Sequence, residues 1–207
     1  MNRALVKTLT LVLALSLTAL CLFACAQQKS GAVIAGPRAH TVNPTGQNVR
    51  LIGRTCETDG TTWLPQSGSA VEFTATGTRV QVEIVGDKSV TGDASLCPRF
   101  AVLVDGEVVL DDTLNKPSRI VEAFSSDTAK TSVVQVIHLT EAKRGAIGVK
   151  AIMVESDTPE PVKPTDAKEL SIEFIGDSIT CGYGVDAAAT QNSYRATDET
   201  FMKSYAY

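Results

Sequence analysis

Short runs of alternating apolar and polar residues, separated by turns, dominate the sequence from about residue 43 to residue 155. Val71, Phe73 and Ala75 form one run, and the stretch 80–84 repeats the pattern after the Thr-Gly-Thr of residues 76–78. A period of two buries one face of a β-strand and leaves the other face in water. We therefore predict two strands here that form a hairpin turned at residues 76–78.

Four further stretches have the same character. Residues 100–104 and 108–110 flank Asp105-Gly106, which is a strong signal for a two-residue hairpin. Residues 133–139 and 146–154 are also rich in β-branched side chains, and no stretch in this region has a helical period. Many short strands at regular spacing predict a β-sandwich or jelly-roll domain, which we place at residues 46–156.

The N-terminus has the pattern of an export signal. Arg3 and Lys7 precede the apolar stretch 9–23, which is somewhat short for a stable membrane span. Leu-Phe-Ala-Cys at 22–25 resembles a bacterial lipobox, and a polar stretch follows it. We expect a signal peptide at 1–24, lipid on Cys25 as the membrane anchor of a bacterial cell-surface protein, and a tether at 25–45. An ordinary signal peptide with a chance cysteine is the alternative.

Cysteines and charge limit the other possibilities. Export permits disulfides, so Cys56 and Cys97, both in loop-like segments, either form a bridge or remain two separate thiols. No Cys/His cluster has the spacing of metal ligands, which predicts the absence of a metal site. The net charge is −4 and basic residues do not cluster beyond the first few positions, which argues against a nucleic-acid partner.

A proline-rich stretch at 157–168 reads as a linker to a second region, 169–207. There an apolar run, 169–175, stops at Gly176 and is followed at once by Asp177 and Ser178. This order predicts a buried parallel strand that presents a serine at its carboxyl edge. Residues 198–207 resemble the start of a helix, but one strand with two helical pieces cannot form a stable domain alone.

Ser178 has the setting of a nucleophile, which also needs a base and donors for an oxyanion. Gly176 allows close backbone approach, and Asp177 either caps the turn or has no special role. His40 and His138 are both far upstream, and we interpret them as structural residues. Trp63 is either a packing residue or a platform for a sugar ring.

The segment Phe-Ile-Gly-Asp-Ser-Ile-Thr at 174–180 resembles the first block of the SGNH, or GDSL-type, hydrolases. With the rest of 176–184, Ser-Tyr-Ala-Tyr at 204–207 and a β domain in front, the chain is similar to carbohydrate esterase family two. Further similarities lie at 53–55, 67–69, 104–107 and 139–142. In that family a jelly roll precedes an α/β/α SGNH domain, and members remove acetyl groups from xylan and related plant polysaccharides.

The resemblance implies that Ser178 is the nucleophile, that its amide helps to bind the oxyanion, and that no cofactor is needed. Tyr183 would either line the site or pack beside it, and the partner would be an acetylated polysaccharide or oligosaccharide. The family's Asp-x-x-His and its other oxyanion residues have no match up to residue 207, so we expect a C-terminally truncated, inactive hydrolase domain. A non-catalytic glycan-binding lipoprotein is the alternative function, and another SGNH activity, such as a lipase or thioesterase, is a third.

Overall fold

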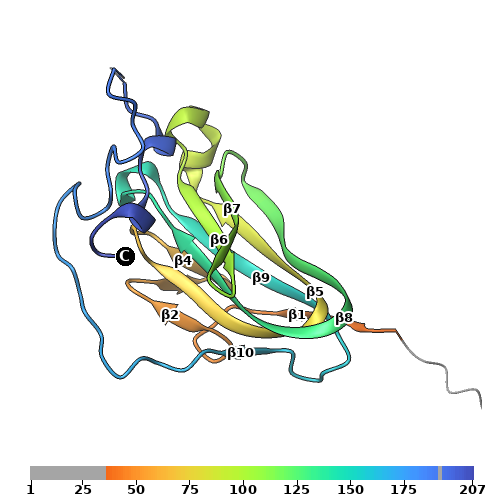
Figure 1. Ribbon diagram of the computed structural model, residues 1–207. Coiled ribbons are helices and arrows are strands. Elements are labelled where there is room, and N and C mark those ends of the chain that lie inside the picture. Colours follow the sequence, from red (N-terminus) through yellow and green to blue (C-terminus); the bar gives the residue numbers. More distant parts are fainter. Residues whose placement is uncertain (1–35, 191–192) are drawn as a thin grey trace, which may run out of the picture. The chain divides into compact units, whose positions relative to one another are not determined.

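The computed structural model describes residues 36–190 and 193–207, and these residues form one antiparallel β-sheet domain with short 3-10 turns (Figure 1). Cys25, the expected signal peptide and the tether up to residue 35 lie outside the described residues. Within the described part, no helix is long and apolar enough to cross a lipid bilayer. The predicted β domain is confirmed as a mostly antiparallel sheet, whereas its arrangement as a sandwich or jelly roll stays a prediction.

Ten strands make up the sheet. They are β1 (Arg38–Val42), β2 (Arg50–Ile52), β3 (Cys56–Thr58), β4 (Thr61–Leu64), β5 (Ala70–Gly86), β6 (Arg99–Val104), β7 (Glu107–Thr113), β8 (Ser118–His138), β9 (Ile147–Ser156) and β10 (Val162–Pro164). Their order is β3-β4-β9-β5-β8-β6-β7, with β1 beside β9 and both β2 and β10 beside β5. The 3-10 turns are η1 (Lys88–Thr91), η2 (Ala94–Leu96), η3 (Ala142–Arg144), η4 (Ala196–Asp198) and η5 (Phe201–Lys203).

The long strand β5 corrects the predicted hairpin at 71–84. Residues 76–78 continue the strand, and the pairing with β8 shifts register between Gly77 and Arg79. A Cβ at Gly77 would lie 2.4 Å from the carbonyl oxygen of Glu155, so a side chain there would collide with the backbone of β9. The glycine therefore marks a bulge and a close backbone approach inside one strand, rather than a turn.

This bulge lets both halves of β5 face the same core. Before it, the odd-numbered Val71, Phe73 and Ala75 are fully buried, whereas after it the even-numbered residues 80, 82 and 84 are buried. An irregular step exchanges the two faces of a strand. The two sets therefore join one hydrophobic cluster with side chains from β6, β8 and β9.

The predicted hairpin at Asp105-Gly106 is confirmed. It joins β6 to β7, and both turn residues have positive φ angles, 52° and 86°. The Asp105 carboxylate also accepts a hydrogen bond from the amide of Val133, at 2.8 Å. The turn is thereby fixed to the neighbouring strand β8.

Both expected linkers contribute strands to the sheet. β1 lies within the expected tether and pairs with residues 152–156 of β9, and β10 lies within the expected 157–168 linker and pairs with β5. His40, on β1, has its Nε2 atom 3.0 Å from the carbonyl oxygen of Ser156. The sheet therefore extends from residue 38 to residue 164, beyond the predicted limits at both ends.

The predicted strand over 169–175 and the predicted helix start near residue 198 are both wrong. In the described residues after β10, regular structure is limited to the turns η4 and η5. Leu170 and Ile175 are each 86% exposed, and Ile172 is 78% exposed. A strand needs a neighbour for its backbone hydrogen bonds, and within the described ranges no strand pairs with this run.

The possible disulfide between Cys56 and Cys97 is not formed. Cys56 is exposed on β3, whereas Cys97 is buried and both are free thiols. The Cys97 sulfur contacts the carbonyl oxygen of Asp93 at 3.4 Å, and the Cys56 sulfur lies 3.5 Å from the hydroxyl of Thr58. The two cysteines thus have different local partners, and the alternative of two separate thiols holds.

Candidate functional site around Ser178

Ser178 lies in an exposed, tight turn. The amide of Thr180 donates to the carbonyl oxygen of Asp177, and the amide of Ile179 donates to the Asp177 carboxylate, each at 3.0 Å. Asp177 therefore caps the turn, which is one of the two roles left open by the sequence. A Cβ at Gly176 would lie 1.9 Å from the Thr180 hydroxyl, so the close approach needs a glycine.

The residues after the turn hold it to a more distant part of the chain. The carbonyl oxygen of Ser178 accepts bonds from the Tyr183 amide at 2.9 Å and from the Cys181 thiol at 3.2 Å. Gly182 has a φ of +75°, and a Cβ there would lie 2.2 Å from the carbonyl oxygen of Thr200. The Thr200 amide donates to the carbonyl oxygen of Gly182, so the turn rests directly on this later backbone.

Tyr183 stacks on Tyr194, with ring centres 4.6 Å apart and planes at 11°. The ammonium group of Lys143 lies 5.3 Å from the centre of the Tyr183 ring. This is the packing role that the sequence left open for Tyr183, and its role in lining a substrate site stays a prediction.

A hollow of about 870 Å³ lies beside the serine. On one side it is lined by the turn, Gly176 to Ser178, and on the other by loops of the β domain that include Arg54 and Gln66. Arg54 also pairs with Glu173 at 3.0 Å, and both side chains are largely exposed. The walls of the hollow carry amide, guanidinium and hydroxyl groups, which suit a ligand rich in hydroxyl groups.

Glu199 is a buried anchor that sequence reasoning missed. Its side chain is fully buried and accepts a 2.6 Å hydrogen bond from the amide of Glu141 and a short one from the hydroxyl of Tyr194. Burial, with Glu199 close by, raises the pKa of Cys181 to about 12 and also raises the pKa of Tyr194. Cys181 is therefore a protonated thiol at neutral pH and no competitor to Ser178 as nucleophile.

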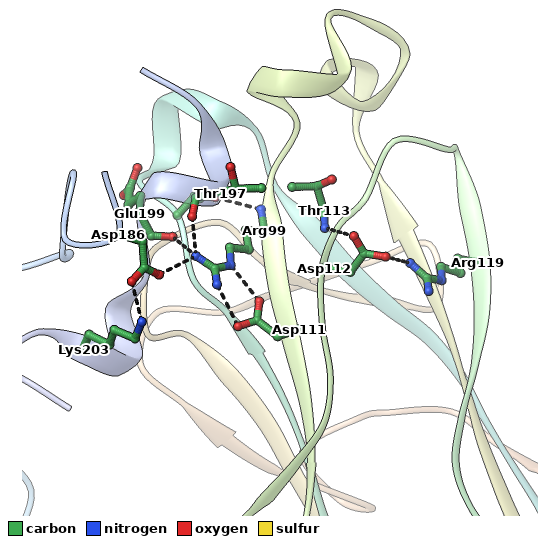
Figure 2. A network of polar contacts seen from close by, with 10 residues as sticks. Arg99, Asp111, Asp112, Thr113, Arg119, Asp186, Thr197, Glu199 and Lys203 are labelled. Carbon is green, nitrogen blue, oxygen red and sulfur yellow. Dashed lines mark hydrogen bonds and ion pairs between the residues drawn. The ribbon is translucent and has the colours of Figure 1, made fainter. Parts of the chain in front are cut away.

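Arg99, at the start of β6, is a second missed anchor (Figure 2). Its guanidinium forms a bidentate pair with Asp111 on β7, at 2.7 and 2.9 Å, and a 3.2 Å ion pair with Asp186. It also donates to the carbonyl oxygens of Thr197, at 2.8 Å, and Glu199, at 3.1 Å. One β-domain side chain thus holds three points of the region that follows Ser178.

Apolar contacts complete this attachment. Phe201 and Met202 pack on a small cluster at one face of the sheet, made of Ala70, Ala101, Leu103, Ile137 and Leu139. The Phe201 amide donates to the carbonyl oxygen of Leu139 at 3.0 Å. A Cβ at Gly68 would lie 2.7 Å from the Phe201 ring, so the ring sits flush against this glycine.

Neither histidine serves Ser178. His138 is fully buried, its Nε2 lies 3.0 Å from the Thr140 hydroxyl, and burial lowers its pKa to about 4. His40 bonds on β1, as described above. Trp63 lies on β4 opposite Cys56 and Gly148 and is half-buried, with its ring beside Gly148, so it packs within the sheet.

Residues 51–164 match the family model described as the carbohydrate esterase 2 N-terminal domain. The chain belongs to this family. The similarity to carbohydrate esterase family two inferred from the sequence is thus confirmed, and it covers the β domain from β2 to β10. Among residues 36–190 and 193–207, no group of three or more His, Cys, Asp or Glu side chains lies together so that it could hold a metal ion.

Two curated relatives are similar to the chain. An acetylxylan esterase/glucomannan deacetylase of Cellvibrio japonicus is 24% identical over 156 residues, which are 74% of this chain and 40% of the relative. The cellulase/esterase CelE of Acetivibrio thermocellus is 29% identical over 144 residues, 68% of this chain and 16% of the relative. The chain therefore spans less than half the length of either.

Solved structures agree on the fold. A family two carbohydrate esterase from Cellvibrio japonicus superimposes with a TM-score of 0.70 at 20% identity, over 81% of this chain and 48% of that one. A family two carbohydrate esterase from Clostridium thermocellum, solved in complex with cellohexaose, gives 0.60 at 25% identity, over 76% and 46%.

Proposed function

We propose that this chain is the N-terminal part of a serine carbohydrate esterase that removes acetyl groups from a plant polysaccharide such as xylan, with Ser178 as the nucleophile. The observation that carries the proposal is the exposed, capped Asp177-Ser178 turn held on a carbohydrate esterase 2 N-terminal domain. We interpret residues 169–207 as the beginning of an SGNH hydrolase domain.

In this reaction the Ser178 hydroxyl attacks the acetyl carbonyl carbon while a base accepts its proton. Backbone amides, including that of Ser178, stabilise the negative charge on the tetrahedral oxygen. The bond between the acetyl carbon and the sugar oxygen then breaks, and the base passes the serine proton to that oxygen, so the sugar leaves as an alcohol. Water, which gives a proton to the base, attacks the acyl-enzyme in turn, so that acetate is released and the serine hydroxyl is restored. Every atom in these reaction steps comes from the protein, the substrate or water, so the proposed reaction needs no cofactor.

The base is the part that these 207 residues do not supply. His40 and His138 bond within the β domain, and His138 resists protonation because it is buried. An unassisted serine hydroxyl is a poor nucleophile at neutral pH. We therefore expect the 207-residue polypeptide to be inactive toward esters on its own.

Two measurements test this proposal. The 207-residue polypeptide is assayed for acetate release from an aryl acetate, and the reading frame downstream of codon 207 is sequenced and any longer product expressed. We expect no turnover by the short chain and acetylated-xylan hydrolysis by the longer product, lost in Ser178→Ala. A longer product whose activity survives Ser178→Ala would rule out the assigned nucleophile, and turnover by the short chain would rule out the missing base.

For partner and location, we propose an acetylated polysaccharide and a bacterial cell surface, reached through lipid on Cys25. The cellohexaose complex of the Clostridium thermocellum relative supports a polysaccharide partner. It also favours the second candidate, a non-catalytic glycan-binding role. Retention of the full chain on insoluble cellulose or xylan, together with a longer product that releases no acetate, would favour that candidate.

A further inference from the structure

The turn that carries Ser178 is connected to the β domain by a short series of contacts. The Thr200 amide bonds to the carbonyl oxygen of Gly182, and the Asp186 amide bonds to that of Asp198. Backbone hydrogen bonds therefore attach residues 181–186 to residues 198–200. That backbone is in turn held by polar contacts with the sheet, because Arg99, on β6, donates to the carbonyl oxygens of Thr197 and Glu199.

Arg99 is built for this attachment. Its side chain is 14% exposed, and the N–H groups of its guanidinium bond to a carboxylate on β7. At the same time they bond to the Asp186 carboxylate and to two backbone carbonyl groups within residues 197–199. Arginine is suited to this because its donors are fixed in one plane, whereas lysine offers a single flexible ammonium group. Loss of Arg99 would remove the partner of the Asp111 carboxylate and of two carbonyl groups, one of which belongs to the fully buried Glu199.

We propose that Arg99 is a positioning residue: from β6 it fixes Asp186 and residues 197–199 on the β domain, and through these residues it holds the Ser178 turn in place. Its importance for catalysis rests on the function proposed for Ser178. The attachment itself is a physical property of the chain and can be measured without any ester.

Cys181 is a native reporter of this attachment. Its thiol bonds to the carbonyl oxygen of Ser178 and is half-buried, so alkylation requires the turn to open locally. The Arg99 guanidinium donates to the backbone carbonyl oxygen of Glu199, whereas the group of Glu199 that lies near the Cys181 thiol is the side-chain carboxylate. A change at Arg99 therefore affects the alkylation rate chiefly by releasing the turn, not by altering the thiol's chemistry.

The experiment measures alkylation of Cys181 by iodoacetamide in the 207-residue chain, followed by mass spectrometry of the labelled peptides. We expect Arg99→Ala to raise the Cys181 rate by roughly tenfold, since hydrogen bonds to a charged group are lost and local opening becomes easier. Arg99→Lys should give a smaller increase, because the charge remains while the fork is lost. The amide resonances of Ser178 and Tyr183 should move in both variants.

Arg119 provides the matched control. Its guanidinium pairs with Asp112 at 2.7 Å, one residue along β7 from the partner of Arg99, and on the far side of that strand from the later segment in Figure 2. Arg119→Ala should leave the Cys181 rate unchanged. Buried Cys97 is the internal control, because its rate rises only when the β domain itself opens.

An unchanged Cys181 rate in Arg99→Ala would overturn the proposal. A parallel rise at Cys97 would overturn it too, because the effect would then be general destabilisation. If Arg99→Ala does not fold, Asp186→Asn weakens the ion pairs of Asp186 with both Arg99 and Lys203, so it tests the attachment from outside the sheet and should also speed Cys181 alkylation; no change would refute the proposal. Failure of Ser178 as a nucleophile would leave all of these rates unaltered, so the two proposals fail separately.

Discussion

Gly68→Ala tests how the Phe201 ring packs against the β domain. Gly68 has a φ of +78°, and an added Cβ would lie 2.7, 2.8 and 3.0 Å from three atoms of the Phe201 ring. Gly60 has almost the same φ, +72°, and nothing within 4 Å of an added Cβ. Gly60→Ala therefore carries the same backbone strain without the collision, and it serves as the matched control.

The two costs can be worked out separately. An L-residue in the left-handed region costs about 1–2 kcal/mol, which both variants share. Overpacking of a filled site adds about 1–3 kcal/mol, and only Gly68→Ala bears this term. The backbone at Gly68 has little freedom to move away, because its amide donates to the carbonyl oxygen of His138 at 2.8 Å. We thus expect a total of about 2–5 kcal/mol for Gly68→Ala, against about 1–2 kcal/mol for Gly60→Ala.

Urea unfolding of the 207-residue chain, followed by the fluorescence of its single tryptophan, Trp63, measures both variants. The decisive comparison is made in a Phe201→Ala background, where the ring that collides with the new methyl group is absent. There the cost of Gly68→Ala should fall to that of Gly60→Ala.

Equal costs for the two glycine variants in the native background would refute this reasoning, since no collision would then exist. A large Gly68→Ala cost that persists without the Phe201 ring would refute it as well, because the strain would arise elsewhere. Either result would mean that the Phe201 ring does not limit the space beside Gly68 as described.

Three further predictions concern single side chains. Because burial lowers the pKa of His138 from 6.5 to about 4, the unfolded chain binds the extra proton first as the pH falls, and stability should drop by about 2–3 kcal/mol between pH 7 and pH 4.5. Urea midpoints at the two pH values should show this drop in the native chain but not in His138→Asn, and equal drops would contradict it. Under native conditions a thiol reagent should modify exposed Cys56 quickly and buried Cys97 slowly, whereas protection of both that is relieved by a reductant would indicate a disulfide after all. Finally, Cys25→Ser should abolish incorporation of radiolabelled palmitate in a bacterial host; retained label would contradict the lipid anchor.

Local sequence signals predicted the parts of the fold that depend on local chemistry. Asp105-Gly106 forms the turn that its residue types favour, because both positions adopt positive φ angles. Gly77 was misinterpreted, since a glycine between two β-prone runs suits a turn and a bulge equally well. Its real reason, the approach of the Glu155 carbonyl group, comes from a strand almost 80 positions later and cannot be seen locally.

The candidate site divides in the same way. The Asp177-Ser178 turn could be predicted because its capping bond spans two residues. The anchors Arg99 and Glu199 could not, because each looks like an ordinary surface charge in the sequence and finds its partners in residues far along the chain. The run 169–175 shows the opposite error: its composition favours a strand, but strand formation depends on neighbours that composition does not describe.

Phe201 and Met202 cover part of the sheet, so the segment needed for a well-packed β domain extends beyond residue 164, where the family match ends. A polypeptide ended at residue 164, where the family match stops, would expose Ala101, Leu103 and Ile137 on the second face of the sheet to water. A contiguous bare apolar surface of this kind promotes aggregation. Anyone who wishes to graft this β domain onto another enzyme, or to express it for a binding screen, should therefore carry the chain through Lys203, where the cover is complete.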